Sequence, residues 1–284
     1  MDQSFWLVVR ESGFALPEGH DLMDLTEELL GWLGSPDPAL RDEIAYFTLA
    51  HWFSQDLYSS KALHEIGQRM VQNLERGLGE VGTDSVFLRT FSILVLGEVV
   101  AVDAKHPALP EPLLRAWREA AENYLQAERD ARGFVPGRGW AHAPAHTADC
   151  LAAFATHPRT DADGLRAILH AVADRVLLYA SSVFLFDEDQ RLANTCLRAL
   201  QRTELTDGEI GKWCERFGRP RETETWRAAS GREEGARTYL NVKSFLRSVY
   251  FQVLWTTAPP PLRESILDHL LVVLCAIGTG PYDQ

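Results

Sequence analysis

Helical patterning runs through almost all of the 284 residues, and the alternation typical of β-strands is nearly absent. A leucine stripe over residues 22–33 predicts a helix that ends at Gly34, because glycine is common just beyond a helix end. Ser35 and Pro36 then predict the N-cap and first position of the next helix, which continues to about Phe53. Repetition of such signals predicts an all-α fold.

The rest of the chain carries the same kinds of signal. Capping pairs are predicted at Thr160 with Asp163, Asp187 with Gln190, and Thr206 with Glu209. Further helices are predicted over residues 60–76, 83–102, 110–130, 160–179, 187–200, 238–257 and 262–277, and another begins between Trp140 and Ala143. The charged segment 218–237 is predicted to be a loop or a short helix.

An internal repeat indicates which all-α architecture the chain adopts. Four segments, which begin at Ser35, Gly82, Gly137 and Phe186, each place a turn before a basic residue or histidine and then an apolar run. Their starts lie roughly 50 residues apart, a period typical of HEAT-like helical hairpins. Because one hairpin cannot bury its apolar face alone, we expect the hairpins to stack. The predicted fold is a HEAT-like α-α superhelix, an α-solenoid of antiparallel hairpins. It is expected to form a single domain over residues 1–284, with 201–284 as its C-terminal helices.

Stacking in register would place basic side chains near the starts of successive inner helices, at Arg41, Arg89, His142 and Arg191. They would line one side of a concave surface, close to Asp42, Asp84, Asp149, Asp187 and Glu188. One interpretation is a polar binding surface, and the other is a set of Arg–carboxylate pairs that hold neighbouring repeats together. For Arg89 we expect a carboxylate partner, with Asp130, Asp149 and Glu188 as candidates.

Composition limits the classes of partner. Hydrophobic residues make up 46% and charged residues 24%, as in a folded soluble protein. The net charge of −12 argues against binding nucleic acid or anionic membranes, since both need clustered Lys and Arg. No apolar stretch is expected to reach the ~20 residues that span a bilayer, because Glu98 interrupts the run around Val95. Without CxxC pairs or a signal peptide, we expect reduced thiols and a cytoplasmic protein.

The stretch 130–151 is where His, Asp, Arg and Trp gather ahead of an apolar helical run. Its glycines predict an irregular approach, and Pro144 is tolerated only in the first helical turn. His142 and His146 would then share a helix face, with Asp149 one turn further on. The ligand-binding residues expected from this placement are Arg89, Glu128, Asp130, Arg132, Trp140, His142, His146, Asp149, Glu188 and Arg191.

Four segments carry a resemblance to a known family: GSPDPALRDEIAYFTLAHW, GTDSVFLRTFS, the ERDARGFVP–GWAHAPAHTADCLAAFATHP run, and DEDQRLA. They follow one another over about residues 29–200, and the chain resembles the bacterial family catalogued as Domain of Unknown Function 2785. The resemblance implies a helical protein and carries no activity. The chain departs from the family pattern at Pro144, Thr147 and Cys150, and it has Arg-Thr-Phe-Ser at 89–92 where Arg-Ser-Phe-Ser is expected.

Chemistry at this cluster has two possible forms. His142, His146 and Asp149, with Cys150 as a fourth ligand, could bind a metal ion, although the glutamate of an HExxH motif is missing. The three could instead act as acid, base and orienting group in a hydrolase, which makes them candidate catalytic residues. The sequence assigns neither a cofactor nor a reaction.

Binding without chemistry is the interpretation that we prefer. Trp140 would supply an aromatic wall, and Arg89 or Arg132 would supply a fork for a carboxylate or phosphate. The expected occupant is a small or anionic ligand or a protein partner, with neither nucleic acid nor membrane as target. A purely structural cluster in an interaction scaffold is the remaining alternative.

Overall fold

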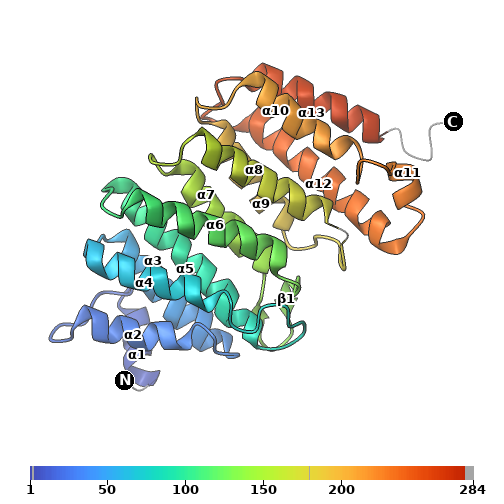
Figure 1. Ribbon diagram of the computed structural model, residues 1–284. Helices are drawn as coiled ribbons and strands as arrows, with labels where there is room; N and C mark the ends of the chain where they lie inside the picture. Colours follow the sequence, from blue (N-terminus) through green and yellow to red (C-terminus); the bar gives the residue numbers. More distant parts are fainter. Residues whose placement is uncertain (2, 179, 279–284) are drawn as a thin grey trace. The chain divides into compact units, whose positions relative to one another are not determined.

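The computed structural model describes residues 1, 3–178 and 180–278 (Figure 1). The chain forms two compact units, Met1–His157 and Pro158–Gln284. Helices dominate both units, and the strands among the described residues are limited to one two-stranded hairpin. The all-α prediction is therefore confirmed.

Unit 1 consists of paired helices and the hairpin. Its elements are α1 (Gln3–Glu11), α2 (Leu22–Trp32), the π-helix η1 (Ala39–Tyr46), α3 (Phe47–Ser54), α4 (Ser60–Asn73), α5 (Ser85–Lys105), α6 (Glu111–Ala127), β1 (Phe134–Val135), β2 (Gly139–Trp140) and α7 (Ala143–Thr156). Helix α4 packs on α5, α6 packs on α7, and α5 also packs on α3 and α7. In Figure 1, α4 and α6 lie side by side over α5 and α7.

Unit 2 continues the pairing of helices. Its elements are α8 (Ala162–Leu177), α9 (Glu188–Leu200), α10 (Asp207–Glu215), the short 3-10 helix η2 (Arg216–Gly218), α11 (Trp226–Ala229), α12 (Glu233–Trp255) and α13 (Arg263–Gly278). Helix α12 packs on α9 and α13, and α10 packs on α13 and α8. Asp189 joins α9 to α12 by accepting hydrogen bonds from Ser244 and Ser248, at 2.7 and 2.8 Å.

The predicted helix start at Ser35 and Pro36 is wrong. The helix begins at Ala39, and the Asp37 carboxylate accepts a hydrogen bond from the Ala39 amide at 2.9 Å. It opens with a π-helix, a rare form that is frequent at functional sites. The hydroxyl of Ser35 instead accepts a hydrogen bond from the Asp37 amide, in the turn before the helix.

Other helix boundaries follow the sequence more closely. Thr206 and Glu209 form the predicted capping box of α10. The predicted cap of α8 at Thr160 is wrong, because the neighbouring Asp161 accepts the hydrogen bond from the Gly164 amide. Helix α12 begins at Glu233, so the end of the charged segment is helical and its acids lie in the first helical turn.

Helix α5 is the core helix of unit 1. Among the described residues it alone has the length and apolar composition to cross a membrane, although 78% of its most apolar stretch is buried inside the protein. The expectation that Glu98 keeps this apolar run shorter than a membrane span is therefore wrong, since the helix meets the criteria of length and composition with Glu98 inside it. Burial against α3, α4 and α7 accounts for this composition.

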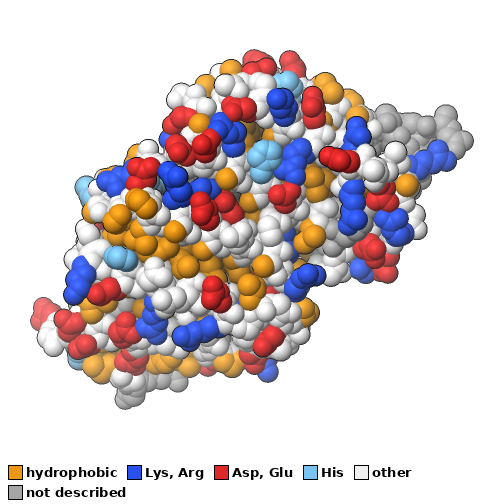
Figure 2. Space-filling model, viewed as in Figure 1, with side chains coloured by type: hydrophobic (Ala, Val, Ile, Leu, Met, Phe, Trp, Pro, Cys, Tyr) orange, Lys and Arg blue, Asp and Glu red, His pale blue; other side chains and the backbone are white. Residues whose placement is uncertain are grey.

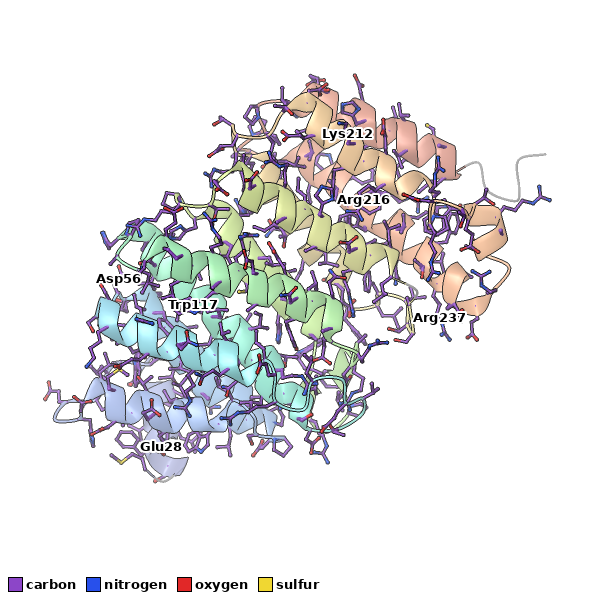
Figure 3. All side chains as sticks on the ribbon, viewed as in Figure 1. Glu28, Asp56, Trp117, Lys212, Arg216 and Arg237 are labelled. Atoms are coloured by element: carbon purple, nitrogen blue, oxygen red, sulfur yellow. The ribbon has the colours of Figure 1, made fainter. Side chains whose placement is uncertain are left out.

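The space-filling view shows hydrophobic side chains reaching the surface of unit 1 along α4 and α6 (Figure 2). Below them, Trp117 of α6 is buried against α4 (Figure 3). A methyl group added at Gly67 of α4 would lie only 2.2 Å from the Trp117 ring. The two helices therefore approach closely at this pair.

Gly97 allows a similarly close approach of α5 to α7, and we predict that Gly97→Val destabilises the protein. A Cβ atom at Gly97 would lie 3.1 Å from the Cys150 Cα atom, so a larger side chain must push the backbones apart. The expected cost is about 1–3 kcal/mol in the free energy of unfolding, measured with urea. Gly31→Ala is the control, because a Cβ atom there meets nothing within 4 Å and alanine favours helices. An unchanged stability for Gly97→Val would contradict the proposed packing.

Candidate functional site

The hairpin before α7 is attached to η1. Strands β1 and β2 pair in antiparallel register, and the Arg138 carbonyl between them accepts a 2.7 Å hydrogen bond from Arg41 Nη2. Gly139 has a φ of +75°, and a Cβ atom there would lie 2.9 Å from Pro38. Only glycine fits this close approach without strain. Gly139 therefore serves the contact of the hairpin with the start of η1.

Arg41 is fully buried between polar and aromatic partners. Its Nη1 donates to the Ser35 carbonyl at 2.7 Å, and its Nε forms an ion pair with the Asp42 carboxylate at 2.7 Å. The guanidinium carbon lies 4.1 Å from the centre of the Phe87 ring and 4.8 Å from that of Phe91. Arg41 therefore joins η1 to α5 and to the hairpin.

Arg89 is also fully buried, and its partner is Glu128. Its Nε and Nη2 donate to the two Glu128 carboxylate oxygens at 2.6 and 3.2 Å. Its Nη1 donates to the Arg76 carbonyl at 3.0 Å and to the Ser85 hydroxyl at 2.9 Å. This arrangement is a bidentate pair of the kind that holds neighbouring helices together.

The predicted partners of Arg89 are wrong. The observed partner is Glu128, which was not among the three candidate carboxylates. Helix α6 ends at Ala127, and Glu128 follows in extended conformation with its side chain buried against Arg89. Asp130 is engaged elsewhere, since its carboxylate accepts from the Gly82 amide at 3.0 Å and from Arg132 Nη2 at 2.7 Å. Burial favours a higher pKa for Asp130, but the hydrogen bonds from Arg132 and the Gly82 amide, together with the charge of Arg132, outweigh burial and hold the pKa below its usual value.

Arg132 connects the loop before the hairpin to the segment before α5. Besides Asp130, its guanidinium donates to the Thr83 carbonyl at 2.7 Å. The predicted forks at Arg89 and Arg132 are therefore both occupied by protein groups. These four residues, Arg89, Glu128, Asp130 and Arg132, tie α5, the end of α6 and the loop together.

The histidines lie where the loop enters α7. His142 is the N-cap residue, with a left-handed φ of 53°, so it precedes the helix instead of lying within it. Its ring stacks on Trp140, with ring centres 4.9 Å apart, and lies 5.6 Å from the ring of His146. His146 Nδ1 lies 3.3 Å from the Thr90 carbonyl, and its ring meets Phe91 edge to face. Both histidines are buried.

Two aromatic side chains near the histidines remain exposed. Trp140 has an exposed fraction of 37%, and Phe134 of 49%. Their rings meet edge to face across the hairpin, 5.2 Å apart. The prediction that Trp140 forms an aromatic wall is consistent with this exposure.

Glu98 is a site residue that sequence reasoning did not select. It is half-buried on α5, and the hydroxyl of Tyr46 donates to its carboxylate at 2.9 Å. Burial raises the pKa of Glu98, and the nearby charge of Asp149 raises it further. A single acid inside the long apolar run 91–102 was the available signal. Tyr46, Glu98 and Asp149 thus form an acidic cluster on η1, α5 and α7.

The two remaining predicted residues, Glu188 and Arg191, belong to unit 2. Glu188 is buried at the first position of α9, and its carboxylate accepts a hydrogen bond from the Phe186 amide at 2.8 Å. The Arg191 amide donates to the Asp187 carbonyl at 3.0 Å. Asp187 is the N-cap residue and has a left-handed φ of 63°, and His142, the N-cap residue of α7, is also left-handed, with a φ of 53°.

The described residues contain no group of three His, Cys, Asp or Glu side chains that could hold a metal ion. His142, His146 and Asp149 therefore do not gather as a ligand set, because His142 lies outside the helix. Cys150 is fully buried, and burial raises the pKa of its thiol well above the usual range. A buried neutral thiol is a poor ligand and a poor nucleophile.

The family described as Protein of unknown function (DUF2785) matches residues 74–251. The chain belongs to this family. The DUF2785 match includes every predicted site residue, and it extends through α9, α10, α11 and most of α12. The resembling segment before residue 74 lies outside it. Comparison with curated proteins and with solved structures finds no match.

We predict that breaking the Arg89–Glu128 pair by Arg89→Met or Glu128→Gln costs several kcal/mol of unfolding free energy. Each change leaves a buried charge without its partner, for which about 3–5 kcal/mol is typical. The double variant Arg89→Met/Glu128→Leu should lose less than the two single variants combined, since it removes both charges. Urea unfolding measures all three.

Arg115→Met is the matched control for this series. Arg115 and Glu111 form an exposed pair at 3.4 Å, and such pairs contribute about 0–1 kcal/mol. Equal effects at Arg89 and Arg115 would show that the buried pair does not stabilise unit 1.

We also predict that Glu98→Gln raises the melting temperature at pH 7 and leaves it unchanged at pH 4. The raised pKa means that the folded state favours the protonated carboxyl, so stability is lost as pH rises through that pKa. Glutamine keeps an oxygen that accepts from Tyr46 and cannot ionise. Thermal unfolding at the two pH values measures the difference, with the exposed Glu75→Gln as control. The same shift at both pH values would contradict this explanation.

Proposed function

We propose that this DUF2785 protein is an interaction protein with a HEAT-like α-solenoid fold, built as a single domain. The repeat spacing of roughly 50 residues supports this architecture, as does the pairing of successive helices within each unit. Solenoids present extended surfaces to partners, so the fold favours binding over catalysis.

We infer that the partner presents a basic side chain to the acidic cluster of Tyr46, Glu98 and Asp149. The half-buried position of the Glu98 carboxylate near that of Asp149 carries this inference, because a cation beside the two acids would offset the cost of their charge. An anionic ligand has less support here, since Arg89 and Arg132 already bind protein carboxylates. The net charge of −12 also favours a basic partner.

Trp140 stacks on His142, whose ring lies 5.6 Å from that of His146 of α7, and we propose that the exposed rings of Trp140 and Phe134 form an apolar end of this surface. Tryptophan is enriched where protein partners bind, and its face attracts cations. A peptide segment with a basic residue and an apolar residue would therefore match both parts of the surface. We propose a cytoplasmic protein partner, with neither nucleic acid nor membrane as the target.

A hydrolase that uses His142, His146 and Asp149 is the weaker alternative. Its support is Glu98, whose raised pKa suits a general acid. The thiol nearest in sequence to His146 is that of Cys150, and its burial opposes ionisation.

A peptide array tests the binding proposal. Each peptide containing Lys or Arg is paired with a copy in which those residues are Gln. We expect the protein to retain basic peptides preferentially, and Glu98→Gln, Asp149→Asn and Trp140→Ala to weaken the binding about tenfold each, as lost charge-assisted contacts do. Glu75→Gln, an exposed acid elsewhere in unit 1, should leave binding unchanged.

Equal binding of the basic peptides and their Gln copies would refute the proposal. A second result would favour a purely structural cluster, namely large losses of thermal stability in both His142→Ala and His146→Ala. His142→Gly serves as a comparison, because glycine accepts the left-handed backbone at that position without strain.

A further inference from the structure

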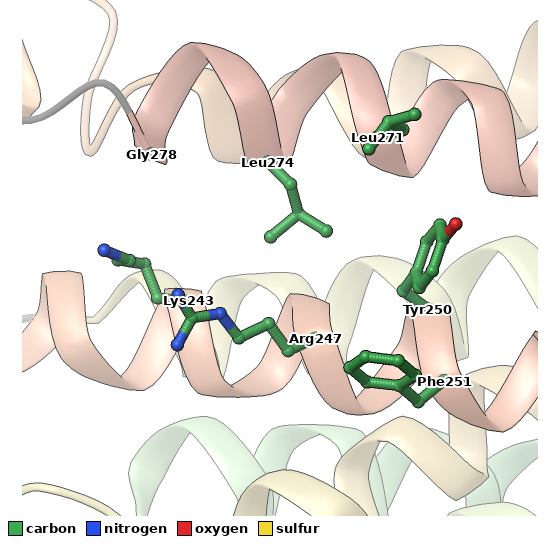
Figure 4. A pocket seen from close by; sticks show the side chains of 7 residues that line it. All are labelled: Lys243, Arg247, Tyr250, Phe251, Leu271, Leu274 and Gly278. Carbon is green, nitrogen blue, oxygen red and sulfur yellow. The ribbon is translucent and has the colours of Figure 1, made fainter.

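A pocket in unit 2 lies between α12 and α13, outside the surface described above. Its volume is about 280 Å³, and it is lined by Lys243, Arg247, Tyr250, Phe251, Leu271, Leu274 and Gly278. Figure 4 shows the ends of the two basic side chains below Gly278 at one side, and the two aromatic rings below Leu271 at the other. The pocket thus has a cationic end and an apolar end.

The cationic end is made by one face of α12. Lys243 and Arg247 are four residues apart, so their like charges are neighbours on the helix and repel each other. Within the described residues, no carboxylate forms an ion pair with either side chain, and the Lys243 ammonium lies 5.1 Å from the centre of the Tyr239 ring. Arg237, on the same helix, does pair with Glu233. Two unpaired cations side by side favour an anion between them.

The apolar end is partly open to solvent. Phe251 has an exposed fraction of 43% and Leu271 of 48%, and the Phe251 ring stacks on that of Trp255. At the C-terminal end of α13, beside the cationic end of the pocket, the hydroxyl of Tyr239 donates to the Ile277 carbonyl at 2.6 Å. This hydrogen bond joins α12 to α13. An apolar group placed between these helices would cover exposed carbon surface.

We propose that this pocket binds a small amphiphilic carboxylate, with its anionic group on Lys243 and Arg247 and its apolar part on Phe251, Leu271 and Leu274. A volume of about 280 Å³ lies at the lower end of the range of small-molecule sites, so the proposed ligand is small. A short fatty acid or an arylalkyl acid has this size. The proposal is independent of peptide binding by unit 1.

Octanoate is the probe for this site, measured by calorimetric titration of the full chain. We expect one molecule of octanoate to bind per chain, and octanamide and acetate to bind at least tenfold more weakly, because each lacks one end of the amphiphile. Arg247→Gln and Lys243→Gln should each weaken octanoate binding about tenfold, the effect of losing a charge-assisted hydrogen bond. Leu274→Gln should weaken octanoate and octanamide alike.

Arg227→Gln is the matched control, since Arg227 is exposed in unit 2 and does not line the pocket. Thermal unfolding checks that each variant is folded; Arg247 is exposed, so its substitution should not disturb the core. Three outcomes would overturn the proposal: no octanoate binding, equal binding of octanoate and octanamide, or equal losses for Arg247→Gln and Arg227→Gln.

Discussion

The buried ion pair between Arg89 and Glu128 determines how the chain of unit 1 passes from α6 to α7. Arg89 also donates to the Arg76 carbonyl, so this one guanidinium joins the turn after α4, the first turns of α5 and the end of α6. A buried arginine needs all of these partners, because an unpaired charge in the interior is far more costly than a lost surface contact. With Glu128 held in this way, Asp130 reaches the Gly82 amide, and the hairpin and α7 follow from there.

The buried and half-buried polar residues of unit 1 are of two kinds. Arg41, Arg89 and Arg132 each form an ion pair with a carboxylate and donate a hydrogen bond to a backbone carbonyl, as expected for residues that hold helices together. Glu98 differs, because it is half-buried, has the charge of Asp149 nearby and accepts a hydrogen bond from Tyr46. The distinction matters for function, since a ligand gains most from groups whose charge the protein itself leaves poorly stabilised.

The two candidate sites carry charges of opposite sign. The acidic cluster of unit 1 has the same sign as the overall charge of −12, whereas the pocket between α12 and α13 presents two cations that form no ion pair with a carboxylate in the part of the chain that the structure describes. Net charge describes long-range attraction and says little about a local site, because nearby groups dominate within a few ångströms. An acidic protein can therefore combine a surface for basic partners with a separate pocket for an anion.

The sequence alone determined the features that depend on residues a few positions apart. Helical stripes, the Thr206–Glu209 capping box and the loop before α7 were predicted because their contacts lie within one or two turns. Tertiary structure decided which carboxylate meets Arg89, since Glu128 and Asp130 are only two residues apart and their directions depend on where α6 ends. It also decided the surroundings of Glu98 in the core helix, because the Tyr46 hydroxyl that donates to its carboxylate and the Asp149 charge that raises its pKa come from other helices. Such contacts join residues far apart in the chain, and no local pattern encodes them.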